Sequence, residues 1–284
     1  QFPVGMDKNG RLIAGFYAGR THTIIENRDC ALGVAENKIV LDIVLDFCME
    51  KKIPAYDETT GKGLLRHVLI RTGHVTGQIM VVLVLASPIL PSKNNFVKAL
   101  LKLHPEITTV VINVNNRNTS MVLGDKEHVI YGKGYIEDEL CGKRFRISPK
   151  SFYQVNPVQT EILYGKALEY AGLTGKETVV DAYCGTGTIG MIASDKAGKV
   201  IGVELNADAV RDARNNAKAN QIRNIQFYQN DAGKFLVEMA GQDAKVDVIL
   251  MDPPRSGSTE EFMSSVVRIG PERIVYVSCN PETL

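Results

Sequence analysis

A cysteine follows an apolar, strand-like segment close to the C-terminal end of the sequence. The segment RIVYV (273–277) leads into Ser278, Cys279, Asn280 and Pro281. A cysteine thiolate is a strong nucleophile, and its free pKa of about 8.5 can be lowered by its surroundings. A lone cysteine is more commonly an inert buried thiol. We therefore interpret Cys279 as a candidate nucleophile whose role depends on the residues that share its site.

Four acidic residues stand at the ends of predicted strands upstream of this cysteine. They are Asp181 in VVDAYC, Glu204 in VIGVELN, Asp231 in YQND and Asp252 in MDPPRSG. Ligands of doubly wound sheets bind at the carboxyl ends of the strands, where the strand order reverses. There Glu204 is placed to accept hydrogen bonds from two ribose hydroxyls, and Asp231 to lie beside an adenine ring. Helix capping is the alternative role for both residues.

The glycine-rich stretch GTGTIG (185–190) follows the first of these strands. Gly185 and Gly187 let the backbone approach a ligand closely. The spacing satisfies the dinucleotide pattern G-x-G-x-x-G, which is a weak signal when it stands alone. Two prolines after Asp252 remove backbone donors and stiffen that loop. We expect Asp252 to point into the same cleft as the glycines, although a chance Pro-Pro turn is the simpler alternative.

The elements that position these residues alternate regularly in the C-terminal half. Apolar segments predict strands at 177–184, 199–205, 224–231, 246–254 and 273–279, and helices are predicted at 189–196, 206–221, 233–240 and 260–270. Near-continuous apolar strands that alternate with helices predict a doubly wound, mostly parallel α/β sheet covered on both faces. Asn206 or Asp208 is expected to cap the second of these helices.

The N-terminal half predicts a mixed α/β unit without a catalytic motif. Residues 67–86 are interpreted as two strands with a turn near Thr76–Gly77, and 107–115 with 119–125 as a second hairpin. Helices are predicted at 33–51 and 94–103. We place the domain boundary near residue 145, which gives a first domain at 1–145 and a second at 146–284.

Composition excludes several classes of protein. The chain has 284 residues, is 44% hydrophobic and carries a net charge of +1, which is typical of a soluble globular protein and gives no general signal for nucleic acid. No apolar run reaches the roughly 18–20 residues that a membrane span needs. The five cysteines contain no CxxC pair, so we expect a reduced, cytoplasmic protein without a metal site.

The motifs together carry a family resemblance. DAYCGTGTIG, GVELN, QND, DPPRSG and YVSCNP occur in this order, and SFYQVNP (151–157) precedes them. In this combination the C-terminal half resembles the RNA uracil-5-methyltransferase family, and GLLRHVLIRTG (63–73) extends the resemblance more weakly into the first half. The similarity is greatest to ribosomal members that act on 23S rRNA of Gram-positive bacteria. It implies a Rossmann-like class I methyltransferase sheet preceded by a mixed α/β central domain, with S-adenosylmethionine as the cofactor.

The resemblance also implies roles for individual residues. Gln154, Tyr183, Glu204 and Asp252 match the positions that bind S-adenosylmethionine, and Cys279 matches the nucleophile that adds to carbon 6 of uracil. Such an addition makes carbon 5 an enolate carbon that can attack a methyl group. The family's general base is a glutamate some tens of residues beyond the nucleophile.

Glu282 stands too close to Cys279 to be that base. We therefore expect the base beyond Leu284, and we expect the chain to be a fragment that lacks N-terminal and extreme C-terminal parts. The four-cysteine iron–sulfur motif that many members carry is not found in this sequence.

The RNA partner implies further contacts. A uridine in a stem is inaccessible, so the target is expected to be single-stranded or flipped out. Phe152, Tyr153 and Arg255 are candidates to line its pocket, and core packing or a surface ion pair is equally compatible with their types. Four basic residues are candidates for phosphate contacts or for a solvated charge run; they are Lys143, Arg144, Arg146 and Lys150. We expect the protein to be a monomer.

Other functions explain fewer of these features. A nicotinamide dehydrogenase accounts for GTGTIG and Glu204 but not for DPPR or the terminal cysteine. An amino-group methyltransferase needs no cysteine and typically has an aromatic residue where Arg255 stands. A cytosine-5 RNA enzyme usually carries a cysteine in the DPPR loop, and a non-catalytic RNA-binding module has no use for both Cys279 and the glycine loop. A tRNA uracil-5-methyltransferase remains the alternative within the family.

Overall fold

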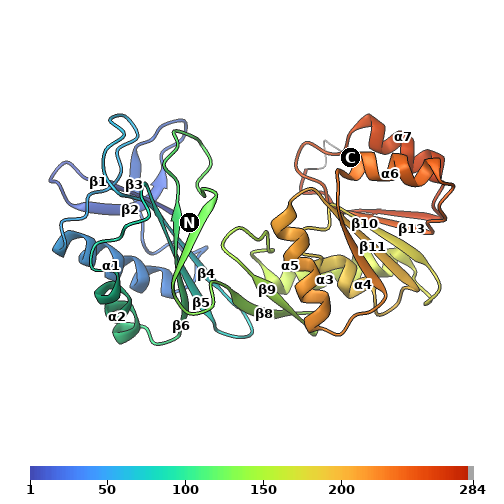
Figure 1. Ribbon diagram of the computed structural model, residues 1–284, viewed down its shortest axis with the longest axis horizontal. Coiled ribbons are helices and arrows are strands. Elements are labelled where there is room, and N and C mark those ends of the chain that lie inside the picture. Colours follow the sequence, from blue (N-terminus) through green and yellow to red (C-terminus); the bar gives the residue numbers. More distant parts are fainter. Residues whose placement is uncertain (281–284) are drawn as a thin grey trace. The chain divides into compact units, whose positions relative to one another are not determined.

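The computed structural model describes residues 1–280 of the chain (Figure 1). The chain divides into two compact units, Gln1–Glu137 and Asp138–Leu284. Within the described residues, the longest helices have 15 residues, and none combines the length and the apolar character that a membrane span requires.

The first unit is built on a seven-stranded sheet with the order β3-β2-β1-β4-β5-β6-β7. Its strands are β1 (Phe2–Met6), β2 (Leu12–Tyr17), β3 (Ile24–Glu26), β4 (Leu65–Thr72), β5 (Ile79–Leu85), β6 (Ile107–Val114) and β7 (Lys126–Tyr131). Only β5 and β6 pair in parallel, because the helix α2 (Lys93–Leu103) connects them. Such a mixed sheet confirms the predicted α/β class of this half.

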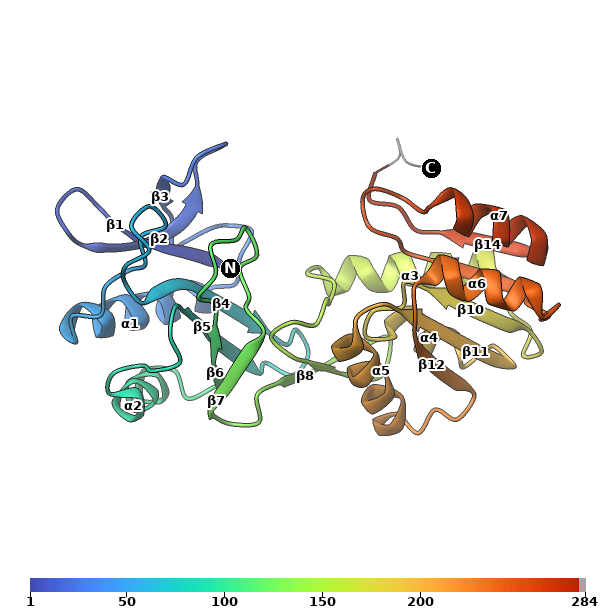
Figure 2. The same ribbon diagram turned by 45° about the horizontal axis from the view of Figure 1, so that its top comes forward.

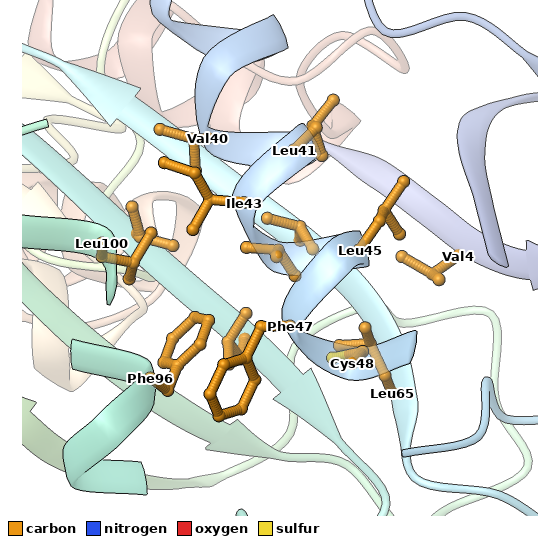
Figure 3. Packing of buried hydrophobic residues seen from close by; sticks show 14 of the residues in the cluster. Val4, Val40, Leu41, Ile43, Leu45, Phe47, Cys48, Leu65, Phe96 and Leu100 are labelled. Atoms are coloured by element: carbon orange, nitrogen blue, oxygen red, sulfur yellow. The ribbon is translucent and has the colours of Figure 1, made fainter. Parts of the chain in front are cut away.

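The core of the first unit lies between the sheet and two helices. Side chains of α1 (Glu36–Glu50) and α2 point toward β4 and β5, as Figure 3 shows for Val40, Phe47 and Phe96. The rings of Phe47 and Phe96 meet edge to face with 5.2 Å between their centroids. β5 is buried along its whole length, which fits its uninterrupted apolar sequence.

One strand of the first unit differs from the prediction. Residues 119–125, predicted as the second strand of a hairpin, form a loop, and β6 pairs with 126–131 instead. The side chains of two buried asparagines cause the difference, because they satisfy the backbone of this loop. Asn113 exchanges two hydrogen bonds with the backbone of Gly124, and Asn115 donates to the carbonyls of Met121 and Val122.

The second unit contains a five-stranded, wholly parallel sheet with the order β12-β11-β10-β13-β14. Its strands are β10 (Thr178–Ala182), β11 (Lys199–Glu204), β12 (Ile225–Gln229), β13 (Val248–Met251) and β14 (Arg273–Tyr276). The chain proceeds outward from β10 to β12 and then returns to the other side of β10 at β13. The predicted doubly wound sheet is therefore confirmed, with its reversal between β10 and β13.

Helices cover both faces of this sheet (Figures 1 and 2). One core holds residues of α3 (Pro157–Ala171), α4 (Thr188–Ala193) and α5 (Ala207–Ala219). The other holds residues of α6 (Ala232–Gly241) and α7 (Glu260–Ile269), which lie side by side. Asn206 caps α5, since its side chain accepts hydrogen bonds from the backbone N–H groups of Asp208 and Ala209.

The boundary between the units falls eight residues before the predicted position of 145. A hairpin of β8 (Ile136–Leu140) and β9 (Lys143–Ile147) explains the shift. Leu140 and Phe145 are buried in the core of the second unit, and the backbone N–H of Arg146 donates to Asn216 on α5 at 2.7 Å. The basic stretch 143–150, which contains the predicted boundary, is thus part of the second unit.

Candidate active site

The reversal point of the parallel sheet brings the glycine loop to the carboxyl end of β10. Tyr183, Gly185 and Gly187 all have positive φ angles, of 64°, 55° and 81°. A Cβ on Gly187 would stand 2.7 Å from the ring of Phe227, whereas one on Gly185 would meet nothing within 4 Å. Gly187 is therefore required for packing against the sheet, and Gly185 leaves open space on the outer side of the loop.

Asp181, on β10, holds the end of the glycine loop through a hydrogen bond. Its side chain is 1% exposed, and its Oδ2 accepts a hydrogen bond from the backbone N–H of Gly190 at 2.9 Å. Burial raises the pKa of Asp181 to about 8, and the charges of Asp252 and Glu204 add to the effect. The structure gives Asp181 a structural role in the loop, and its predicted contact with a cofactor stays a prediction.

Glu204 ends β11 and ties it to the glycine loop. Its Oε2 accepts a hydrogen bond from the backbone N–H of Gly185 at 3.0 Å, and its Oε1 accepts one from the N–H of Asn206 at 2.8 Å. Two backbone donors thus fix the orientation of a half-buried carboxylate. Each oxygen keeps acceptor capacity for another donor, so the carboxylate is preorganised for a ligand with neighbouring hydroxyls.

Asp231 caps a helix. Its Oδ1 accepts a hydrogen bond from the backbone N–H of Lys234 at 3.1 Å, at the beginning of α6. This contact confirms the capping interpretation. The side chain is exposed at the carboxyl end of β12, and its predicted place beside an adenine ring stays a prediction.

Asp252 belongs to a hydrogen-bonded group that joins four segments of the second unit. Gln154, in the loop before α3, donates from Nε2 to Oδ2 of Asp252 at 3.5 Å. The hydroxyl of Tyr164 on α3 is hydrogen-bonded to Gln154 and to Thr188 at the start of α4. Burial raises the pKa of Tyr164 to about 12, and burial also raises the pKa of Asp252.

Sequence reasoning identified Gln154 and Asp252 but missed Tyr164. A tyrosine inside an amphipathic helix has the pattern of an ordinary core residue, and its 3% exposure agrees with that pattern. The only sequence signal is the polar tip that a buried tyrosine must satisfy. The structure brings Gln154 and Asp252, which are 98 positions apart in the sequence, together beside Tyr164.

Tyr183 connects the glycine loop to the loop after β13. Its hydroxyl donates to Oγ of Ser258 at 3.2 Å, and its ring packs against Phe262 with 5.6 Å between centroids. Ser258 was not predicted, because serines in Gly/Ser-rich loops carry no specific signal. The two loops on either side of the reversal point are therefore linked directly.

Cys279 lies beyond the carboxyl end of β14 and is exposed. The predicted strand 273–279 is shorter in the structure and ends at Tyr276, after which the N–H of Val277 donates to the carbonyl of Met251 at 2.9 Å. Ser278 then closes a tight turn with the backbone of Asn280. Since Tyr276 pairs with Met251, Cys279 and Asp252 leave neighbouring strands at the same edge. Glu282, which the sequence excluded as a base, lies outside the described residues.

The other cysteines have the environments of packed thiols. Cys48 and Cys184 are buried, and Cys30 and Cys141 are half-buried. Burial raises the pKa of Cys48 to about 12, and burial also raises the pKa of Cys184. These two thiols are held in the unreactive protonated form. Among the described residues, no cluster of His, Cys, Asp and Glu is arranged to hold a metal ion.

The candidates for RNA contacts separate into exposed and packed residues. Phe152 is 68% exposed, and Arg255 is also exposed. Tyr153 is half-buried and packs against Phe145, with 6.2 Å between centroids, which favours its core interpretation. Of the basic stretch, Lys143 forms an ion pair with Asp195 at 2.7 Å.

The remaining members of that stretch differ in exposure. Arg144 is exposed, and Arg146 and Lys150 are half-buried. Phosphate contact and a solvated charge run both stay predictions for these residues.

The chain is similar to known RNA methyltransferases in sequence and in structure. The family model described as tRNA (Uracil-5-)-methyltransferase matches residues 64–284. An uncharacterized RNA methyltransferase of Halalkalibacterium halodurans is 45% identical over the whole chain, and one of Caldanaerobacter subterraneus subsp. tengcongensis is 43% identical. This chain spans 62% and 63% of their lengths.

A solved structure is similar to this chain along nearly its whole length. It is the tRNA (uracil-54, C5)-methyltransferase of Pyrococcus abyssi in complex with S-adenosyl-L-homocysteine, with a TM-score of 0.81 and 25% identity. The likeness covers 99% of this chain and 66% of that one. The expected Rossmann-like methyltransferase sheet with a preceding mixed α/β domain is thereby confirmed. On the family match and the full-length similarity, the chain belongs to the tRNA (Uracil-5-)-methyltransferase family.

Proposed function

We propose that this chain catalyses the S-adenosylmethionine-dependent methylation of carbon 5 of uridine in RNA. The observation that supports it most is the position of Cys279, an exposed thiol three residues beyond the end of β14, at the same edge of the sheet as Asp252 after β13. Membership of the family supports the reaction type. The P. abyssi protein with its bound S-adenosyl-L-homocysteine supports the cofactor.

The residues at the reversal point suit this cofactor. The oriented carboxylate of Glu204 can accept hydrogen bonds from both ribose hydroxyls, and the open space at Gly185 leaves the loop backbone accessible. Asp252 and Gln154 can hold the amino-acid end, because a carboxylate and an amide recognise its charged groups. Tyr183 and Asp231 complete the proposed set. When bound, S-adenosylmethionine supplies an electrophilic methyl group on its sulfonium.

The chain's own part in the chemistry centres on Cys279. The thiolate forms a bond from Sγ to carbon 6 of uracil, and the carbon 5–carbon 6 double-bond electrons move toward the carbonyl at carbon 4. Carbon 5 then bears the electron density that accepts the methyl group. A base removes the carbon 5 proton, the double bond reforms, and the Sγ–carbon 6 bond breaks to restore the thiolate. We assign this base to no described residue.

We propose 23S rRNA as the substrate RNA, with a single-stranded or flipped uridine as the target. The support is the similarity of the motifs to ribosomal members of the family. A tRNA substrate is the second candidate, favoured by the description of the matching family and by the P. abyssi neighbour. We further propose that the protein acts in the cytoplasm, because its cysteines are unpaired, and that it acts as a monomer.

A methylation assay with defined RNAs tests the proposal. Protein, labelled S-adenosylmethionine and fragments of 23S rRNA or whole tRNA are incubated, and the digested nucleosides are separated by mass spectrometry. The proposal expects 5-methyluridine in the rRNA fragments. 5-Methyluridine only in tRNA would support the second substrate. Methylated cytidine or adenosine, without 5-methyluridine in either RNA, would contradict the reaction type.

A further inference from the structure

A basic groove lies on the outer edge of the second unit, outside the site described above. It has a volume of about 660 Å³, and its lining comes from the C-terminal half of α5, the turn after it and the edge strand β12. Figure 2 shows the two elements, α5 and β12, in the second unit. Its lining contains three cationic residues, Arg214, Lys218 and Arg223, and no acidic residue. The chain as a whole carries 33 basic and 32 acidic residues, so such a separation of charge is a local feature.

The helix places two of these cations on one stripe. Arg214 and Lys218 are four residues apart on α5 and therefore lie on the same face. Arg223 follows in the turn that leads to β12. All three residues are exposed. Among the described residues, none of the three forms an ion pair with a carboxylate, in contrast to Lys143, which is paired with Asp195.

One of the cations is held in place by the sheet. Nη2 of Arg214 donates to the backbone carbonyl of Phe227 at 2.7 Å. A guanidinium has five N–H donors, so this contact fixes the side chain against β12 and leaves donors for an anion. The Arg214 side chain is therefore already ordered before a partner binds, so less conformational entropy is lost on binding.

The groove leads toward the proposed active site. Its lining extends from the turn at Gln221 to Tyr228, near the carboxyl end of β12. β12 ends at Gln229, two residues before Asp231, at the sheet edge where the glycine loop and Glu204 lie. A strand of nucleic acid along β12 would therefore run toward the edge that binds the target base.

We propose that the α5–β12 groove binds the phosphate backbone of the RNA substrate, away from the modified uridine. This inference rests on the proposed RNA substrate. A row of unpaired cations, with Arg214 prepositioned, matches the spaced negative charges of a polynucleotide. The polar edges of Gln221, Gln226 and Tyr228 suit contacts with sugar and phosphate oxygens. Because these contacts read no base edges, the groove contributes affinity and register, not sequence preference.

Binding measurements in the absence of cofactor test this proposal separately from the chemistry. The double variant Lys218→Ala/Arg223→Ala is compared with Lys196→Ala/Arg268→Ala, which removes the same charges from exposed positions outside the groove. Affinity for fluorescein-labelled oligouridylate and oligoadenylate is measured by anisotropy over a series of salt concentrations. Thermal unfolding confirms that both variants are folded.

The groove variant is expected to lose about tenfold in affinity for both RNAs at low salt. The slope of log K against log salt should fall in magnitude by about 1.4, since each phosphate contact on a single strand contributes about 0.7. The control variant should match the wild type. An unchanged slope in the groove variant, as expected if the β12 edge served a protein partner, would overturn the proposal. Wild-type protein that binds both RNAs but forms no 5-methyluridine would instead speak against the proposed reaction and leave the role of the groove in binding intact.

Discussion

The carboxylate of Glu204 accepts a hydrogen bond from the backbone N–H of Gly185 at 3.0 Å. This contact joins the end of β11 to the loop that follows β10, so the acid and the glycine loop form one rigid surface. A second N–H, from Asn206, holds the other oxygen. The acid that we assign to the ribose is therefore oriented in the absence of any ligand, which lowers the entropy lost on binding.

Replacement of Glu204 by alanine should weaken S-adenosylmethionine binding. Loss of a charged acceptor costs about 1.5–3 kcal/mol, which is roughly a ten- to a hundredfold increase in Kd. Isothermal titration calorimetry measures the change directly. Glu238→Ala, at an exposed position of α6, is the control and should bind as the wild type does. Equal affinity of Glu204→Ala and the control would remove Glu204 from the cofactor site.

Tyr164→Phe should make the side chain of Gln154 less well positioned without leaving a cavity in the core, because only the hydroxyl group is lost. Its hydrogen bonds to Gln154 and Thr188 contribute about 0.5–1.5 kcal/mol to stability. If Gln154 positions the cofactor, KM for S-adenosylmethionine rises severalfold while kcat changes little. Tyr170→Phe, on the same helix and 63% exposed, is the matched control. A lower Tm with an unchanged KM would reduce Tyr164 to a purely structural residue.

Gly187→Ala should destabilise the second unit and abolish cofactor binding. Its φ of 81° is unfavourable for alanine, and its Cβ would stand 2.7 Å from the ring of Phe227. Strain of this kind costs about 1–3 kcal/mol. Gly165→Ala, inside α3 with open space around it, should instead raise stability by up to about 1 kcal/mol. Comparable unfolding temperatures for the two variants would contradict the assigned packing of the glycine loop.

The buried Asp181 predicts a pH dependence of stability. Its folded pKa of about 8 lies above the ordinary value of 3.8 for an aspartate, so folding favours the protonated form. This contribution is fully present below the unfolded pKa and is lost as pH rises through about 8. The side chain of Asp181→Asn cannot ionise, so the variant does not lose this contribution. The Tm of the variant minus the Tm of the wild type should therefore increase as pH rises from about 4 to about 8.

Calorimetric scans of both proteins at a series of pH values measure that difference. The dependence cannot exceed about 1.4 kcal/mol per pH unit for a single group. A Tm difference that stays constant with pH would mean that Asp181 is ionised in the folded protein throughout.

The parallel sheet was predictable because its signal is local. Each strand is a short apolar run, and each run ends at a polar residue that the topology must bring to the same edge. For this reason Asp181, Glu204 and Asp252 were identified in sequence at the places where the structure has them. The strand before Cys279 was predicted too long, because the tight turn at Ser278 depends on a side-chain hydrogen bond to Asn280.

Features that depend on distant side chains were not predictable. Nothing local distinguishes the 119–125 loop from a strand, since Asn113 and Asn115 on β6 decide its conformation. β7 has the polar sequence KEHVIY and exposes most of its residues, so it gives no apolar signal. Tyr164 was missed for the related reason that its partners lie on other elements. The domain boundary shifted because a basic hairpin proved to pack on the second unit.

The central claim is that Cys279 adds to the uracil ring. Wild-type protein, Cys279→Ala and the control Cys30→Ala are incubated with S-adenosylmethionine and RNA that carries 5-fluorouridine, and the products are examined by intact mass spectrometry. Fluorine on carbon 5 cannot leave as a proton, so the methylated covalent adduct accumulates. We predict this adduct for the wild type and for Cys30→Ala, and its absence from Cys279→Ala, which should still bind the cofactor with unchanged affinity. An adduct of the same mass on Cys279→Ala, or full methyl transfer by that variant, would contradict the account.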